Sequence, residues 1–183
     1  MGPAEKIFME LLKVRVPIEL VMVAGRNQEL KERLGKISVP ERHHVKVLGF
    51  TDKIDELMRV ADIVVSKPGG LTASEALACG AAMAVINPLP GFEMQNSDFL
   101  LENHAAIKIQ QIETISHKIT QLLNDPEKLA VLKRNAGDLG DTHAAFRMAK
   151  IVMKHIRKKR DRKKEKELAT IKDKDGKQHV SAL

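Results

Sequence analysis

The stretch ADIVVSKPGGLTASEALACG, residues 61–80, decides the fold class of this chain. Its apolar start, residues 63–65, predicts a buried strand, and the helix formers of residues 71–79 predict a helix that ends at Gly80. Pro68 disfavours helix at Lys67, so residues 66–70 form a loop. A strand that enters a helix through a glycine-rich loop directs free backbone N–H groups at one point, which suits a phosphate. The spacing is neither a G-x-G-x-x-G fingerprint nor a P-loop, so the stretch indicates an anion site of unspecified ligand.

Strand and helix patterns alternate on both sides of this stretch. Further strands are predicted over residues 18–24, 45–48, 82–87 and 105–109. Helices are predicted over residues 5–13, 28–34, 52–60, 91–103, 112–123, 126–136 and 143–166. Such alternation implies parallel strands joined by right-handed crossovers. The predicted fold class is therefore α/β, a Rossmann-like parallel sheet flanked by helices.

The predicted order begins with a helix rather than a strand. In doubly wound folds the first strand and its glycine-rich turn usually lie in the middle of the sheet. Two interpretations stay open: a fold that starts with a helix, or a domain whose first strand is absent from this chain. We expect the second.

The positive charge of the chain is concentrated at one end. The 183 residues carry a net charge of +7, yet residues 1–153 hold 19 Lys and Arg against 19 Asp and Glu. Residues 154–183 hold 12 against 5, so the whole excess lies there. We therefore expect one domain over residues 1–150 and a basic tail, helical to disordered, over residues 151–183.

The basic tail allows two interpretations. Residues 154–166, which run from Lys154 to Lys166, can bind an anionic membrane surface electrostatically, or they are the solvated end of a helix. They contain no apolar face beyond Ile156. The tail has no aromatic side chain to stack on bases, so nucleic acid is not an expected partner.

Composition also restricts the compartment and the chemistry. The single Cys79 excludes an internal disulfide, which favours a reducing cytoplasm. No apolar run approaches the roughly 18 residues that cross a bilayer, and no signal peptide opens the chain. We expect a cytoplasmic protein. A peripheral location on the inner face of the membrane is the alternative. The seven histidines have no metal-ligand spacing, so no metal and no cofactor are expected.

Four segments together resemble a known family. They are VAGRN (23–27), LGFTDKIDELM (48–58), SKPGGLTASEALACG (66–80) and INPLPGFEMQNSDFLLENHAA (86–106). They resemble the C-terminal, donor-binding half of glycosyltransferases with two facing Rossmann-like domains. Monogalactosyldiacylglycerol synthases and bacterial processive diacylglycerol glucosyltransferases are the nearest in pattern, and the peptidoglycan N-acetylglucosaminyltransferase is more distant. The resemblance covers about residues 2–150.

The resemblance implies an activity. The donor would be UDP-galactose or UDP-glucose, the acceptor diacylglycerol or a glycolipid, and transfer would invert the anomeric centre without a bound metal. Gly2-Pro3-Ala4-Glu5-Lys6 is similar to the end of the family's first glycine-rich loop. The acceptor half and its general base would then lie outside this chain, which would hold no catalytic residue. There are two alternatives. One is a catalytically inactive fragment that binds a nucleotide sugar, and the other is a protein like the N-acetylglucosaminyltransferase or a UDP-sugar epimerase.

The resemblance assigns the stretch around the glycine loop to the ribose and the diphosphate. Glu75 would accept hydrogen bonds from both ribose hydroxyls, or it only complements the helix N-terminus. Backbone N–H groups and one hydroxyl would bind the diphosphate, or the same residues form an ordinary left-handed turn and N-cap. These residues are Gly69, Gly70, Leu71 and Thr72. Lys67 would neutralise phosphate or is solvated.

Two other strand ends complete the nucleotide site in this reading. Phe50 and Thr51 would read the uracil edge, although a core position is the better prediction for the Phe50 side chain alone. Gly25, Arg26 and Asn27 follow the first predicted strand, where ligands of doubly wound sheets bind. Arg26 suits a phosphate, or it is a solvent-facing loop arginine.

The sugar would be read by Glu93 and Asn96. They match a Pro-Gly-x-Glu-x-x-Asn pattern whose polar residues contact sugar hydroxyls in the family. The sequence departs from the family at three places: Phe92 stands for a usual Gln, His104 for a usual Gly, and Ala81-Ala82 for Leu-Pro. These departures leave the identity of the sugar open.

Overall fold

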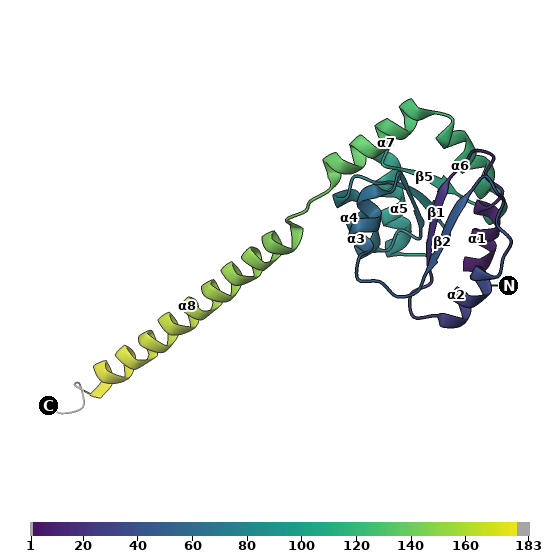
Figure 1. Cartoon of the computed structure of the whole chain (residues 1–183). Coiled ribbons are helices and arrows are strands. Elements are labelled where there is room, and N and C mark those ends of the chain that lie inside the picture. The colour runs from purple at the N-terminus through teal and green to yellow at the C-terminus, as the bar shows by residue number, and fades with distance from the viewer. Residues whose placement is uncertain (1, 179–183) are drawn as a thin grey trace. The chain divides into compact units, whose positions relative to one another are not determined.

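The computed structural model describes residues 2–178 and confirms the α/β class (Figure 1). Five strands are described: β1 (Glu19–Val23), β2 (His44–Leu48), β3 (Ile63–Ser66), β4 (Ala82–Ile86) and β5 (Ala106–Ile109). The helices that alternate with them are α1 (Pro3–Leu11), α2 (Gln28–Gly35), α3 (Ile54–Val60), α4 (Gly70–Ala78) and α5 (Phe92–Glu102). The chain continues through η1 (Ile112–Thr114), α6 (Ile115–Leu123), α7 (Pro126–Leu139) and α8 (Ala144–Gln178). Every strand pairing is parallel, as the alternation predicted.

The chain divides into two compact units, Met1–Asp141 and Thr142–Leu183. The first unit holds all five strands. The second is built on the single helix α8, which runs twelve residues beyond the predicted helix end at residue 166. Residues 179–183 of the expected tail lie outside the described residues.

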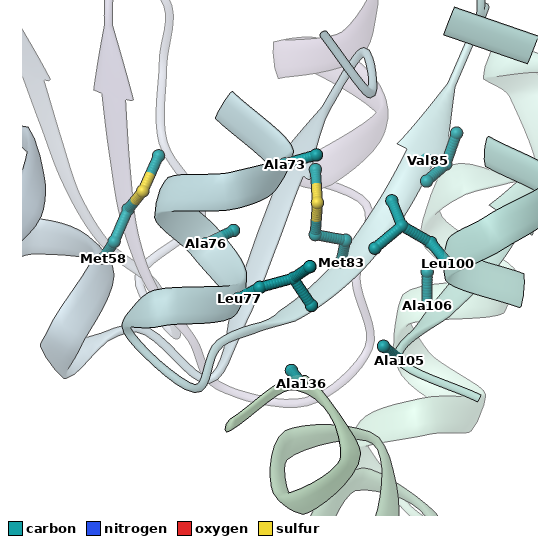
Figure 2. Close-up of a cluster of buried hydrophobic side chains, with 10 residues drawn as sticks. All are labelled: Met58, Ala73, Ala76, Leu77, Met83, Val85, Leu100, Ala105, Ala106 and Ala136. Atoms are coloured by element: carbon teal, nitrogen blue, oxygen red, sulfur yellow. The ribbon is translucent and has the colours of Figure 1, made fainter. Parts of the chain in front are cut away.

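Strand β4 shows why the sheet is covered on both faces. All five of its residues are buried, as expected for the interior of a parallel sheet. Met83 and Val85 point to one face, where they contact α4 and α5 side chains such as Leu77 and Leu100 (Figure 2). Ala84 points to the other face, in a cluster formed with α1, α6 and β5. The alternating side-chain direction of one strand therefore joins the two helix layers.

The parallel sheet is in two parts. β1 pairs only with β2, while β3, β4 and β5 form a separate three-stranded sheet. Leu20 of β1 and Val65 of β3 nevertheless pack against the same hydrophobic cluster. The parallel sheet therefore divides between β1 and β3.

Local sequence signals predict several element ends that the structure confirms. Gly80 has a φ of 67°, and Ala81 N–H donates to the Ala76 carbonyl, so α4 ends in the predicted C′ glycine. Asp125 caps α7 by accepting from Lys128 N–H at 3.0 Å. The helix predicted over residues 112–123 starts as a short 3₁₀ turn, η1, before α6 begins.

One departure from the family pattern has a backbone cost. His104 has a φ of 51°, in the left-handed region that glycine adopts freely. The side chain itself is exposed, so its removal leaves no cavity. We expect His104→Gly to raise the free energy of unfolding by about 1 kcal/mol. Urea denaturation measures the free energy of unfolding. The control is His117→Gly in α6, which should lose stability. Equal losses in both variants would contradict a preference for glycine at position 104.

Candidate functional site

Four loops lie at the carboxyl edge of the two parallel sheets. They follow β1, β2, β3 and β4, and the carboxyl ends of parallel strands in one doubly wound unit face the same side. The residues predicted to bind a nucleotide sugar lie in these loops or in the first two turns of α4 and α5. The structure therefore brings segments between residues 24 and 96 to one edge.

The N-terminus of α4 is open to a ligand. Gly69 is the N-cap residue, with φ −60° and ψ 147°, and no side chain described in residues 2–178 caps the helix. The N–H groups of Gly70, Leu71 and Thr72 belong to the first turn, where an α-helix offers no internal acceptors. Free N–H groups and the positive end of the helix dipole together make an anion site.

Neither glycine of this loop is required by the fold itself. Gly69 and Gly70 have no positive φ, so the alternative of a left-handed turn is wrong. A Cβ at Gly69 would meet no atom within 4 Å, and one at Gly70 would only reach the Asn96 amide at 4.0 Å. The space that side chains would fill is therefore open for close approach of a ligand to the backbone.

Glu75 lies on the exposed face of α4. It is exposed and follows Leu71 by four residues and Thr72 by three, so the three share one face of the helix. Its carboxylate makes no hydrogen bond or ion pair among the side-chain interactions of the described residues. The first turn of α4 contains no acidic residue, so Glu75 is not placed to complement the helix N-terminus. Its two oxygens remain available to accept hydrogen bonds. Lys67, before the helix, is exposed as well.

The loops after β1 and β2 touch each other. The Arg26 guanidinium lies 5.3 Å from the centroid of the Phe50 ring. Phe50 is 68% exposed, so the prediction of a core side chain is wrong. Arg26 is also exposed, and its stacking keeps the guanidinium at the edge of the sheet.

Two polar side chains in these loops serve the backbone nearby. Asn27 caps α2 by accepting from Leu30 N–H at 2.9 Å, and Thr51 accepts from Lys53 N–H at 3.1 Å. Sequence reasoning did not single out Lys31, whose Cδ would lie 3.6 Å from a Cβ at Gly49. The sequence did contain a signal for the position of Lys31. It follows the cap residue Asn27 by four residues, and this spacing places the two side chains on the same face of the helix.

Helix α5 is tied to the glycine loop. Asn96 Nδ2 donates to the Pro68 carbonyl at 2.9 Å, across 28 residues of sequence. Glu93 accepts from Leu89 N–H at 2.7 Å and so closes the loop in front of α5. Both side chains are half-buried. The structure therefore gives these two residues a positioning role within the protein.

The Asn96 contact makes a testable prediction. Asn96→Ala removes a donor to the Pro68 carbonyl, and we expect it to lower the free energy of unfolding by about 1 kcal/mol. Asn96→Asp should cost more, because a carboxylate oxygen would face a carbonyl oxygen. Thermal denaturation orders the variants; an Asp variant as stable as wild type would contradict the donor role.

Large apolar side chains are exposed at the same edge. Leu71 at the start of α4 and Phe92 at the start of α5 are 82% and 83% exposed, and Leu89 is 53% exposed. Sequence reasoning noted Phe92 only as a departure and did not single out Leu89. Loop residues have no periodicity, so no sequence pattern indicates which of their side chains face solvent. In the part of the chain that the structure describes, no group of three His, Cys, Asp or Glu residues is placed to hold a metal ion.

Comparison with known families decides what these loops belong to. Residues 6–138 match the model of the family described as glycosyl transferases group 1. This chain belongs to that family. The match spans the whole carboxyl edge, from the loop after β1 to the start of α5.

The curated relatives share the same region. The processive diacylglycerol beta-glucosyltransferase of Bacillus pumilus (strain SAFR-032) is 37% identical over 140 residues, which are 76% of this chain and 37% of that protein. The protein of the same name from Bacillus subtilis (strain 168) is 38% identical over 122 residues, 67% of this chain and 32% of that protein. The chain thus spans about a third of the length of these relatives.

Solved structures show the same fold. The crystal structure of Acinetobacter baumannii MurG superposes with a TM-score of 0.70 at 22% identity, over 82% of this chain and 45% of that one. The glycosyltransferase VinC in complex with dTDP gives a TM-score of 0.53 at 14% identity, over 76% of this chain and 42% of that one. At these identities the likeness concerns the fold alone.

Proposed function

We propose that residues 1–150 bind the UDP-sugar donor of an inverting glycosyltransferase that transfers a hexose to a lipid acceptor such as diacylglycerol. One observation carries this proposal: the uncapped N-terminus of α4 and the unpaired carboxylate of Glu75 lie on one exposed helix face. A diphosphate and a ribose are joined directly in UDP, so a donor site needs both features side by side. The names of the curated relatives support diacylglycerol as acceptor.

The loops take different parts of the donor in this proposal. The N–H groups of Gly70, Leu71 and Thr72 bind the diphosphate, and Lys67 and Arg26 add positive charge. Glu75 accepts from the two ribose hydroxyls. Backbone groups of Phe50 and Thr51 read the uracil edge, while Gly25 and Asn27 shape the neighbouring loop.

The sugar half of the donor would face α5. Glu93 and Asn96 lie at its start, where their oxygens and amide are within reach of hexose hydroxyls once the loop after β4 adjusts. A buried polar group left unpaired by the wrong hexose costs about 1–3 kcal/mol, which gives such a site its selectivity.

The reaction needs these groups mainly for the leaving group. An acceptor hydroxyl oxygen attacks the anomeric carbon, the bond from that carbon to UDP breaks, and UDP leaves with the electron pair. The hydroxyl proton goes to a base, which we expect to come from an acceptor domain. N–H groups fixed at the helix end stabilise the negative charge that develops on UDP, an effect often worth about 3–4 kcal/mol per donor in enzymes.

A second candidate uses the same exposed face of α4: a protein that binds a nucleotide sugar without transferring it. The sequence resemblance keeps an N-acetylglucosaminyltransferase type of donor as a further alternative, and an epimerase-like protein as a weaker one.

The location of the protein is part of the same proposal. We propose a cytoplasmic protein that reaches its acceptor at the inner membrane surface, with residues 154–166 attracted to anionic lipid. No helix within residues 2–178 is long and apolar enough to cross a membrane.

Calorimetry separates these candidates. UDP titrated into the purified chain should release or absorb heat at a single site, whereas CMP, which lacks the β-phosphate, should bind much more weakly. Transfer from radiolabelled UDP-glucose or UDP-N-acetylglucosamine to diacylglycerol in mixed micelles is measured alongside. Binding without transfer favours the binding protein, and no binding at millimolar UDP contradicts both.

A further inference from the structure

Helix α8 begins with a segment that has two chemically different faces. Residues 144–158 are all exposed, and they include six large apolar residues whose surfaces are 51–65% accessible. These residues are Phe146, Met148, Ile151, Val152, Met153 and Ile156. So much exposed apolar surface is unusual for a helix whose surroundings are water alone.

The polar face of the same segment is entirely basic. At 3.6 residues per turn, five basic side chains fall within an arc of about 100°, and the apolar residues fill most of the remainder. The five are Arg147, Lys150, Lys154, Arg157 and Lys158. Residues 144–160 contain seven Lys or Arg and no Asp or Glu, and the first acidic residue is Asp161. Within residues 144–158, only His155 interrupts the apolar arc.

We propose that residues 144–158 of α8 lie in the headgroup region of an anionic lipid bilayer, with the apolar face buried among the acyl chains. Helices that bind in this way have a wide apolar face and a polar face rich in Lys and Arg. The basic face supplies the attraction to anionic headgroups, and the apolar face supplies the depth of insertion. This inference deepens the proposed function, because a diacylglycerol acceptor has to be reached at a bilayer.

The contact between Lys150 and Phe146 fits this arrangement. Lys150 Nζ lies 4.7 Å from the Phe146 ring centroid, at the border between the two faces. A lysine stem can follow an apolar surface while its ammonium group stays with water or phosphate. Residues 157–160 are all Lys or Arg and lie on every side of the helix, so insertion should end at Ile156 and give way to electrostatic contact.

The charge pattern favours lipid over a protein groove as the occupant. A helix that docks in an apolar groove leaves its outer face in water, where mixed charges are usual. The polar face of residues 144–158 carries one sign only, which complements a surface of uniform negative charge. A phosphatidylglycerol bilayer is such a surface.

The helix position of two neighbouring residues allows a direct test. Val152 lies near the centre of the apolar face and Lys154 near the centre of the basic face, since two residues turn the helix by about 200°. The chain contains no Trp or Tyr, so Val152→Trp and Lys154→Trp each introduce one dominant fluorophore. With vesicles of equal parts phosphatidylglycerol and phosphatidylcholine, Trp emission should shift to the blue and be quenched by brominated lipid in the first variant only. Equal responses, or none, would overturn insertion.

Two matched triple variants test the two faces in the full chain. Replacing Ile151, Val152 and Ile156 by Gln should lower the affinity for vesicles, measured by co-sedimentation, by on the order of 100-fold at both low and high salt. Replacing Lys150, Lys154 and Lys158 by Gln should weaken it by a similar factor at low salt only. If the apolar variant binds vesicles as well as wild type, the contact is purely electrostatic and the proposal is wrong. A helix that docks on a protein instead would leave all vesicle assays negative.

The donor site supplies the control for this experiment. Both triple variants should bind UDP with the affinity of the wild-type chain, because their changes lie outside Met1–Asp141. Loss of vesicle binding with UDP binding retained would concern α8 alone. Vesicle binding without UDP binding would leave α8 as proposed and contradict the donor site.

Discussion

Glu75→Ala is expected to weaken UDP binding by about 10- to 100-fold, because it removes a charged acceptor shared by two ribose hydroxyls. The reason lies in the geometry of α4. Glu75 is exposed on the face that also carries the free N–H groups of the first turn, and no basic side chain in the described residues forms an ion pair with it. Its carboxylate therefore needs little reorganisation before it accepts a ligand. Isothermal titration calorimetry with UDP measures the effect.

Three controls make the Glu75 result specific. Glu75→Gln keeps one acceptor oxygen and should fall between wild type and the alanine variant. Glu127→Ala changes an exposed glutamate early in α7, outside the four loops, and should leave UDP affinity unchanged. The nucleotide 2′-deoxyuridine diphosphate should bind the wild-type chain more weakly than UDP does. It should bind the alanine variant about as well as UDP does. Equal affinity of Glu75→Ala and wild type would remove Glu75 from the site.

Among the single substitutions proposed for this protein, Gly140→Ala is expected to cause the largest decrease in the free energy of unfolding. An added Cβ would lie 2.2 Å from the Leu77 carbonyl oxygen and 2.7 Å from Ala78 Cα, where α7 ends against the end of α4. These are backbone atoms, which cannot rotate away, so one of the two helix ends has to move. Overpacking of this kind costs about 1–3 kcal/mol or somewhat more. Urea denaturation followed by circular dichroism gives the free energy of unfolding.

The matched control lies one turn earlier in the same helix. A Cβ at Gly137 would come no closer than 3.9 Å to Gly80 Cα, which is an ordinary contact. Gly137→Ala should therefore leave stability unchanged or raise it by up to about 1 kcal/mol through helix propensity. If Gly140→Ala is as stable as Gly137→Ala, the close approach of α4 and α7 is not maintained in solution.

Much of the fold could be predicted because it depends on local chemistry. The predicted strand ends, Val65 and Asn87, lie within one residue of the observed ends, since a proline signal follows each strand closely. The C′ glycine at Gly80 was also predictable, because a left-handed residue is needed wherever such a helix stops. The family followed from motifs in the correct order, and the match over residues 6–138 confirms it.

The site required tertiary information at several points. Phe50 follows a buried strand, so local pattern placed it in the core, yet the turn after β2 exposes it beneath Arg26. Asn96 and Pro68 are separated by 28 residues, and only the adjacency of β3 and β4 brings the amide to the carbonyl. The two faces of α8 do not follow from the charge count over residues 154–166, because most of the apolar positions precede that segment.

The sequence by itself determined the α/β class, the parallel alternation and the glycine loop that opens α4, since each depends on residues close together in the chain. Only the tertiary structure decided which loops meet, where the sheet divides between β1 and β3, and why position 140 needs glycine. These features depend on distances between backbones far apart in sequence. Hydrophobic periodicity specifies which face of an element is buried, but not which other element comes to cover it.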